Sequence, residues 1–165
     1  MLPWRESGAE VVAIPEDDGG HVDMTALVRV LVRLADRPLK VGAFSAASNV
    51  TGVLSDVDAI TAALHLHGAL ACWDYAACAP YVPIDMNPSV PLLQKDAVYF
   101  SGHKFVGGPG SPGVLVVKRR LMASCAVPTM PGGGTVFFVT ERDHRFLARV
   151  EDREEGGTPD IRRCA

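Results

Sequence analysis

The stretch Ala97-Val98-Tyr99-Phe100-Ser101-Gly102-His103-Lys104 joins a short apolar run to a compact group of polar residues. The apolar run predicts a buried β-strand over residues 97–100. That strand leads directly into a hydroxyl, a glycine, an imidazole and an amine, and a glycine- and proline-rich turn follows at residues 107–113. Chemistry-bearing side chains at the carboxyl end of a strand are typical of α/β sheets, which collect their ligands at that edge.

Short β-like runs alternate with helical stretches on both sides of this segment. The predicted strands cover residues 11–14, 39–44, 69–73 and 114–117, with a further one indicated at 136–139. Apolar periodicity predicts a helix over residues 24–34 with Asp23 as its N-cap, and a second helix that ends near His67 with Ser55 or Asp56 as its N-cap. The alternation predicts an α/β fold with a mostly parallel sheet flanked by helices.

Length and charge narrow the class of protein. A chain of 165 residues fits one domain, or a piece of a larger one. A net charge of −3 gives no electrostatic case for nucleic acid or an anionic membrane as partner. No apolar run approaches the ~20 residues that cross a bilayer, and the first residues lack a secretion-signal pattern. We therefore expect a cytoplasmic protein with no nucleic-acid or membrane partner.

The cysteines and histidines predict neither a disulfide framework nor a metal site. Four cysteines are present, at positions 72, 78, 125 and 164, and none forms a CxxC pair. Cys72 and Cys78 stand in apolar surroundings, so we expect small core residues there. His65 and His67 lie near a predicted helix end without a matching ligand cluster, so no metal is expected.

Lys104 stands among side chains that can serve an anion. Ser101 offers a hydroxyl and His103 an imidazole within three residues of it, and Gly102 lets the backbone come close to a ligand. A lysine taken alone is most often a solvated surface charge. The residues by themselves leave both interpretations open, an anion-binding group and an exposed loop.

Two further polar residues follow predicted strands. Asp74 ends the apolar run 69–73, and Asn49 lies in the polar loop 45–52 after the strand 39–44. A buried carboxylate needs a positive or hydrogen-bonding partner, so Asp74 is either a structural turn cap or the counter-ion of a protonated ring nitrogen. Loop asparagines mostly make turns. Because these residues and Lys104 follow three separate strands, they predict a composite site at one edge of the sheet.

The glycine run Gly132-Gly133-Gly134-Thr135 carries little information alone. Glycine-rich loops often contact phosphate. This one lacks the lysine spacing of a Walker motif and opens no recognisable strand–loop–helix unit. A nucleotide-binding domain is therefore the least supported interpretation of the sequence.

Together these segments resemble the class V aminotransferase family, which contains cysteine desulfurases and selenocysteine lyases and belongs to the fold-type I pyridoxal phosphate enzymes. The resemblance extends over nearly the whole chain. It is carried, in order, by residues 48–52, 73–76, 101–104, 132–134 and 155–159. Each motif is modest, and the order of the set makes it specific.

The resemblance implies pyridoxal 5'-phosphate as cofactor and an amino acid as substrate. Lys104 would form the Schiff base with the cofactor and later move protons at the substrate α-carbon, with His103 beside it as a second catalytic residue. Asp74 would pair with the ring nitrogen and keep it protonated. Ser101 and His103 would bind the cofactor phosphate or flank the ring.

Two further roles come from the same resemblance. Asn49 would approach the ring hydroxyl and the substrate carboxylate. Thr158 would reach the phosphate bound by a partner subunit, because family sites are built across a homodimer. The sequence departs from the desulfurase pattern at Ala77, where many members carry a glutamine that contacts the ring oxygen.

Length is the second departure, because family members are well over twice as long. We expect residues 1–165 to be a partial cofactor-binding large domain, without its N-terminal part and without the C-terminal small domain. The substrate and the branch of the reaction (desulfuration, transamination, elimination or racemisation) stay open at this point. The alternative is a truncated, non-catalytic fragment or interaction module that keeps the cofactor-site motifs.

Overall fold

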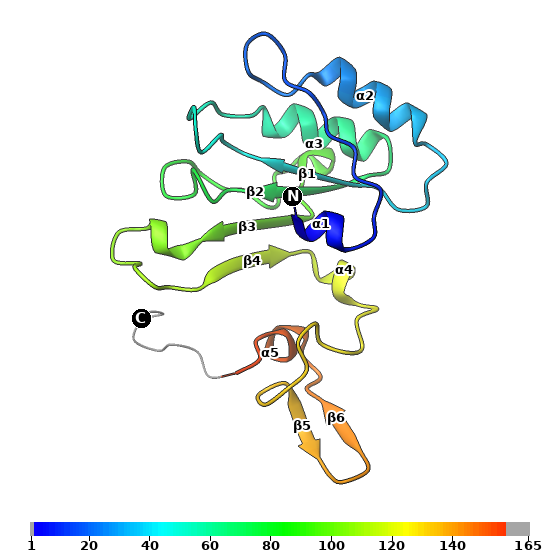
Figure 1. Cartoon of the computed structure of the whole chain (residues 1–165), viewed down its shortest axis with the longest axis vertical. Helices are drawn as coiled ribbons and strands as arrows, with labels where there is room; N and C mark the ends of the chain where they lie inside the picture. The colour runs from blue at the N-terminus through cyan, green and yellow to red at the C-terminus, as the bar shows by residue number, and fades with distance from the viewer. Residues whose placement is uncertain (1, 158–165) are drawn as a thin grey trace. The chain divides into compact units, whose positions relative to one another are not determined.

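A computed structural model describes residues 2–157, which fall into two compact units, residues 1–100 and residues 101–165 (Figure 1). The units are described one at a time. The elements of the first unit are α1 (Leu2–Glu6), α2 (Met24–Arg33), β1 (Val41–Ser45), α3 (Val57–Leu66), β2 (Leu70–Asp74), the short 3-10 turn η1 (Pro91–Leu93) and β3 (Ala97–Ser101), whose last residue opens the second unit.

Strands β1, β2 and β3 form a parallel sheet in that order, which confirms the predicted fold class. Ser45 lies opposite Asp74, and Asp74 lies opposite Tyr99. Since all three strands run the same way, their carboxyl ends lie along one edge. Because of this register, the residues that follow β1 lie next to those that follow β2.

Both predicted helices of the first unit begin at capped residues. The Asp23 side chain accepts a hydrogen bond from the Ala26 amide (2.9 Å), and that of Asp56 accepts one from the Ala59 amide (3.0 Å). Asp56, rather than Ser55, is thus the N-cap of α3. Gly68 follows that helix with a φ of 68°, the left-handed conformation that ends helices without strain at glycine.

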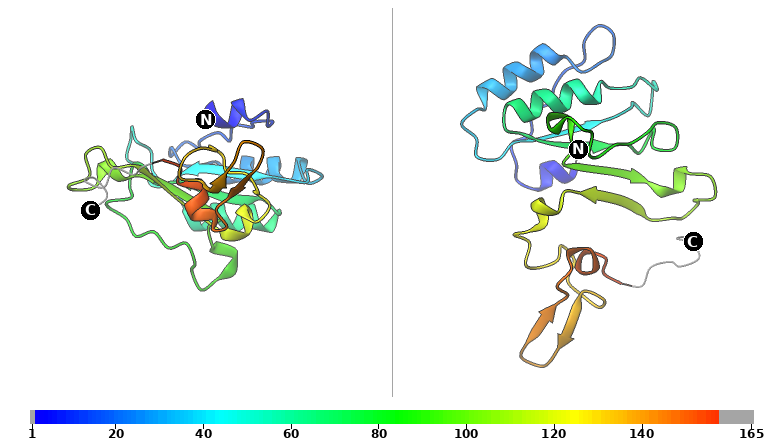
Figure 2. Two further views of the ribbon diagram at one scale, coloured as in Figure 1. Left: turned by 90° about the horizontal axis from the view of Figure 1, so that it is seen from below. Right: turned by 180° about the vertical axis from the view of Figure 1, so that it is seen from behind.

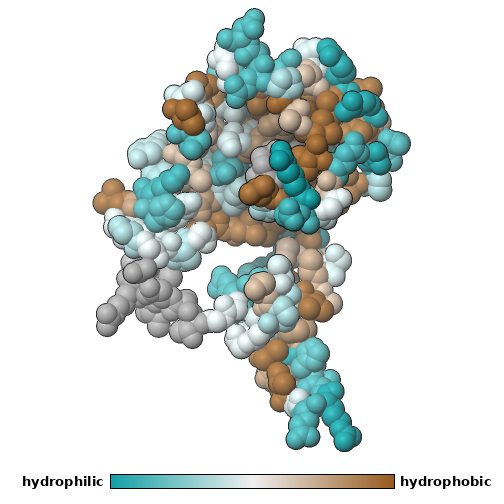
Figure 3. All heavy atoms as spheres, viewed as in Figure 1, coloured by the Kyte–Doolittle hydropathy of each residue, from teal (hydrophilic) through white to brown (hydrophobic). Residues whose placement is uncertain are grey.

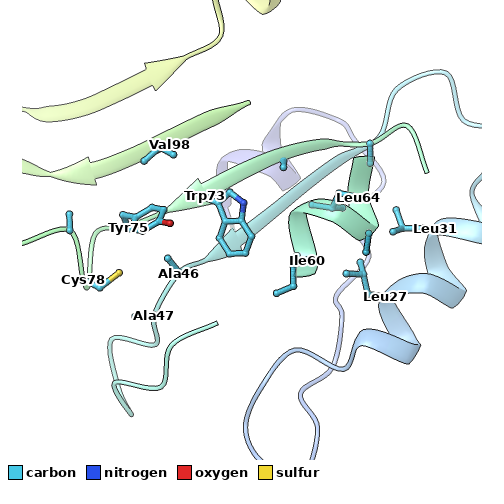
Figure 4. Close-up of a cluster of buried hydrophobic side chains, with 14 residues drawn as sticks. Leu27, Leu31, Ala46, Ala47, Ile60, Leu64, Trp73, Tyr75, Cys78 and Val98 are labelled. Atoms are coloured by element: carbon cyan, nitrogen blue, oxygen red, sulfur yellow. The ribbon is translucent and has the colours of Figure 1, made fainter. Parts of the chain in front are cut away.

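The core of the first unit lies between the sheet and α3 (Figure 4). Ile60 and Leu64 are buried on the inner face of α3, and Leu64 fills the space above Gly42, where any side chain would collide with it. The fully buried Trp73 donates a hydrogen bond from Nε1 to the Thr61 hydroxyl (2.9 Å). A paired indole N–H allows the largest side chain of the core to be buried without an unsatisfied polar group.

Helix α2 lies alongside α3, as the opposite views of Figures 1 and 2 agree. It contributes Leu27 and Leu31 to the core, while Val32 on its other side is 59 % exposed. The amphipathic pattern read from the sequence therefore describes this helix correctly.

The prediction of a strand at residues 11–14 is wrong. The segment runs without regular structure to an isolated bridge between Glu16 and Val22. The Asp17 carboxylate closes the turn between them, accepting from the Gly19 and His21 amides. A β-like run becomes a strand only beside a hydrogen-bonded neighbour, and this one has none.

The second unit continues from the 3-10 turn η2 (Gly102–Lys104). It contains β4 (Gly113–Val117), α4 (Arg119–Met122), β5 (Val136–Val139), β6 (His144–Phe146) and α5 (Val150–Glu154). Strands β5 and β6 pair antiparallel, so the strand indicated at residues 136–139 is confirmed as one arm of a hairpin. In Figure 3 the hairpin, at the bottom, is hydrophobic near its base and hydrophilic at its tip.

Cys72 and Cys78 are buried in the first unit, as expected of small core residues. His65, near the end of α3, is hydrogen-bonded through Nδ1 to the Leu92 carbonyl (2.7 Å) and through Nε2 to the Asp96 carboxylate (2.9 Å). Within residues 2–157 no helix is long and apolar enough to cross a membrane, and no group of three His, Cys, Asp or Glu side chains could hold a metal ion.

Candidate functional site

Asn49 lies at the tip of a closed loop between β1 and α3. Ser48 accepts hydrogen bonds at Oγ from the Val50 and Thr51 amides, while its own amide donates to the Val53 carbonyl (2.9 Å). Ser48 therefore supplies the turn chemistry that a loop asparagine often provides. The exposed Asn49 side chain makes no hydrogen bond within residues 2–157.

Asp74 is the last residue of β2, and both its main chain and its side chain are anchored. Its carbonyl accepts from the Ala46 amide (2.8 Å), and its Oδ1 accepts from the Ala76 amide (2.7 Å). Oδ2 accepts no hydrogen bond within the described chain. The carboxylate is half-buried and held in one orientation, with one oxygen left for a ligand.

The groups around Asp74 make it the negative charge of this strand edge. Burial raises the pKa of the Tyr99 phenol, and the charge of Asp74 raises that pKa further. Burial also raises the pKa of the Cys78 thiol, with Asp74 again a secondary cause. Both groups therefore stay neutral at physiological pH. The carboxylate favours a cation, such as a protonated ring nitrogen, beside it.

Ser101, His103 and Lys104 lie in the second unit, where β3 turns into η2. Ser101 is the N-cap residue of η2, yet its hydroxyl makes no capping hydrogen bond. His103 and Lys104 are exposed. The Lys104 amine has no hydrogen bond or ion pair within residues 2–157.

Apart from Asp74, the predicted cofactor-binding side chains of the described residues make no hydrogen bond to the rest of the fold. The hydroxyl, imidazole and amine of the 101–104 segment share this property with the Asn49 amide. Other loop polar groups of the described chain do the opposite: Asp17 and Thr140, for example, accept hydrogen bonds that close their own turns. An aldehyde cofactor needs such a free primary amine, and the residues present fit it.

The first unit brings two of the predicted residues to one edge of its sheet. Asn49 and Asp74 belong to the first unit, at the carboxyl ends of adjacent strands, while residues 101–104 belong to the second. Thr158 lies outside the described residues. Sequence reasoning missed Tyr99 as a neighbour of Asp74, because their contact depends on the strand register and no local pattern signals it.

The run Gly132–Gly134 forms a turn closed by Thr135. The fully buried Thr135 hydroxyl donates to the Gly132 carbonyl (2.7 Å) and accepts from the Gly132 amide (3.1 Å). The Gly157 amide donates to the Gly133 carbonyl (3.0 Å), so the two glycine motifs lie against each other. The element that follows is strand β5, and a helix N-terminus for a nucleotide phosphate is therefore not formed here.

Known proteins resemble this chain over nearly its full length. The family model described as aminotransferase class V matches residues 2–164. A probable cysteine desulfurase of Halobacterium salinarum is 35% identical over 98% of this chain and 37% of its own length. Probable cysteine desulfurase 2 of Mycobacterium leprae is 33% identical over 96% of this chain and 36% of its own length.

Solved structures of cysteine desulfurases also resemble this chain over nearly its full length. The apo structure of cysteine desulfurase from Thermococcus onnurineus superposes with a TM-score of 0.77 at 27% identity, covering 98% of this chain and 39% of that one. The cysteine desulfurase CsdA from Escherichia coli has a TM-score of 0.77 at 29% identity and is covered over 38% of its length. The chain therefore spans less than two-fifths of the proteins it resembles.

Proposed function

Because this chain belongs to the class V aminotransferase family, whose cofactor is pyridoxal 5'-phosphate, we propose that Lys104 is the lysine to which the cofactor attaches. The complete protein would then be a cysteine desulfurase-like enzyme that acts on an amino acid. The observation that carries the proposal is the state of the Lys104 amine, which is exposed and has no partner within residues 2–157 although its backbone is fixed in a turn. An amine in that state is available to a carbonyl group.

Asp74 is proposed to hold the pyridine nitrogen. Its Oδ1 is occupied by the Ala76 amide, so Oδ2 is the oxygen available to a ring N–H. When bound, the protonated ring supplies an electron sink for the electron pair released at the substrate α-carbon. Keeping that ring nitrogen protonated is the part of the chemistry that falls to Asp74.

The remaining site residues are proposed to orient the cofactor and the substrate. Ser101 can donate from its hydroxyl to a phosphate oxygen, and His103 can donate from its imidazole to that phosphate or flank the ring. Asn49 can offer its amide to a ring hydroxyl or a substrate carboxylate. Lys104 would also be the base that holds and returns the proton at the substrate α-carbon.

The substrate class and assembly follow from the relatives and are part of the proposal. Several relatives are described as cysteine desulfurases, so cysteine is the first amino acid to test. Ala77 stands where many desulfurases carry a glutamine, which removes one contact to the ring oxygen. Thr158 is proposed to bind the phosphate held by a partner subunit in a homodimer.

The first experiment tests cofactor attachment at Lys104. The chain is incubated with pyridoxal phosphate, scanned for a visible absorption band, reduced with borohydride and digested for peptide mass analysis. We expect the band and a mass increment on the peptide that contains Lys104. Lys104→Ala should lose both.

Lys40→Ala is the matched control, because Lys40 already donates hydrogen bonds to the Ala35 and Arg37 carbonyls. This variant should keep the band and the labelled Lys104 peptide. Equal labelling of Lys40 and Lys104 would make the adduct a nonspecific amine reaction and overturn the proposal. Absence of any adduct on the intact chain would favour the non-catalytic interaction module instead.

A further inference from the structure

The segment from Gly102 to Ser111 is a closed loop held by its own backbone. Three successive hydrogen bonds run along it: the Phe105 amide donates to the Gly102 carbonyl (3.1 Å), the Gly108 amide to the Phe105 carbonyl (3.0 Å), and the Ser111 amide to the Gly108 carbonyl (2.9 Å). Lys104 lies inside the first of these turns. Its side chain is exposed, and the three hydrogen bonds hold the backbone of the loop that carries it.

Two glycines, Gly102 and Gly108, allow the backbone of this loop to pack closely against itself. A Cβ at Gly108 would lie 2.2 Å from the Gly102 carbonyl oxygen and 3.1 Å from the Phe105 carbonyl oxygen. A Cβ at Gly102 would lie 2.6 Å from Ser111 Oγ and 2.8 Å from the Pro112 carbonyl oxygen. Distances below about 3 Å cannot be tolerated, so each glycine leaves room for backbone that passes directly over it.

The contact at Gly108 is the less adjustable of the two. The atom it would strike is a backbone oxygen, and that oxygen already accepts the hydrogen bond that closes the Lys104 turn. At Gly102 the nearest atom is the end of a serine side chain, which can rotate away, and the next, the Pro112 carbonyl oxygen at 2.8 Å, lies outside the Lys104 turn. Any residue larger than glycine at 108 must therefore move the Gly102 carbonyl and, with it, the turn.

We propose that Gly108 is a positioning residue for Lys104: its missing side chain admits the Gly102 carbonyl, which closes the turn and fixes the direction of the lysine. The inference rests on the proposed attachment of the cofactor at Lys104. It extends that function to a residue that makes no contact with the amine. Gly102 acts in the same way, with Ser111 packed above it.

Fixing the lysine matters because covalent attachment and proton transfer both depend on orientation. A reacting amine held in place by rigid backbone avoids the entropy that a mobile loop loses at each step. An opened loop would leave the Lys104 amine chemically intact while spreading it over many directions. The expected loss is thus in the rate of attachment.

The test measures the loop with and without cofactor. Hydrogen exchange of the cofactor-free chain reports the Phe105, Gly108 and Ser111 amides, with those of strand β2 as the internal standard. Gly108→Ala should speed loop exchange by about tenfold or more while β2 is unchanged. With pyridoxal phosphate added, the rate of adduct formation at residue 104 should fall by a similar factor, about tenfold.

Gly133→Ala is the matched control, because a Cβ there meets nothing within 4 Å and the backbone has no positive φ. It should change neither rate. If Gly108→Ala unfolds the chain, so that β2 also exchanges rapidly, Gly102→Ala replaces it, with a smaller effect in the same direction. Exchange and attachment rates equal to those of Gly133→Ala would overturn the positioning role.

The two proposals fail in different ways. Normal cofactor attachment in the parent chain and in Gly108→Ala, with unchanged loop exchange, would overturn the positioning role and leave the function in place. No attachment in the parent chain would overturn the function, and with it the role of Gly108 toward Lys104. Faster loop exchange in Gly108→Ala would then show only that Gly108 keeps the turn closed.

Discussion

Asp96 shows how one buried side chain can join several parts of the first unit. It is 1 % exposed; its Oδ2 accepts a hydrogen bond from the Ala71 amide (2.8 Å) and is hydrogen-bonded to His65 Nε2 (2.9 Å). His65 in turn donates from Nδ1 to the Leu92 carbonyl, which can only accept. A carboxylate in this place links helix α3, strand β2 and the segment before β3.

Removing the charge of Asp96 should therefore be costly. We expect Asp96→Asn to lower the free energy of unfolding by about 2 kcal/mol, because an amide in place of the buried carboxylate cannot keep all of its hydrogen bonds and leaves a buried polar group unsatisfied. Urea denaturation followed by tryptophan fluorescence measures this, since Trp4 and Trp73 both lie in the first unit.

The control for that experiment is Glu10→Gln, which removes the charge of an exposed pair with Arg37. Both side chains of that pair are more than half exposed, so the expected cost is below about 1 kcal/mol. If the two variants lost the same stability, the Asp96 network would contribute no more than a surface ion pair.

Among the secondary-structure elements, α3 depends most clearly on its first residue. Asp56→Ala removes the carboxylate that accepts from the Ala59 amide and should destabilise the first unit by about 1 kcal/mol. Asp56→Ser should recover most of this, because a hydroxyl can accept the same hydrogen bond. Thermal unfolding by circular dichroism provides the measurement, with the exposed Asp18→Ala as reference; an Asp56→Ala midpoint equal to that reference would contradict the capping role.

The sequence predicts elements well where the signal is local. The caps at Asp23 and Asp56 and the periodicity of α2 and α3 depend on neighbours within one helical turn, and each is confirmed. The prediction fails at residues 11–14, which have a β-like composition but no neighbouring strand to pair with. It also omits β6, because the short segment His144–Phe146 carries no strand signal of its own and becomes a strand only by pairing with β5.

For the whole chain, the family could be recognised from the order of its motifs, while the geometry around them could not. The segment 101–104 is one of the five motifs that carry the resemblance, and the family match over residues 2–164 confirms the relationship. The close approach of Gly108 to the Gly102 carbonyl and the place of Tyr99 opposite Asp74 depend on three-dimensional closure and strand register. Neither leaves a trace in composition or spacing.

Stability at alkaline pH is a property of the whole first unit, because two of its buried acids resist ionisation. Burial raises the pKa of Cys72 from 9.0 to about 11, with the Asp96 charge as a second cause. Burial likewise raises the pKa of Tyr75 from 10.0 to about 12, with Cys78 and Asp58 as further causes. The unfolded chain releases these protons first, so the native state holds more protons over this window and its stability must fall as pH rises.

The contribution of Cys72 should be complete below pH 9 and lost as pH rises to about 11. A shift of this size corresponds to roughly 2 to 3 kcal/mol. Cys72→Ala isolates it: the variant starts less stable at neutral pH because a buried sulfur is gone, and the gap between it and the parent chain should narrow between pH 9 and 11. Urea denaturation across that range measures the gap. A constant difference in stability between Cys72→Ala and the parent chain would show that the Cys72 thiol has the same pKa in the folded and unfolded states. The loss of stability at alkaline pH would then come from the tyrosines.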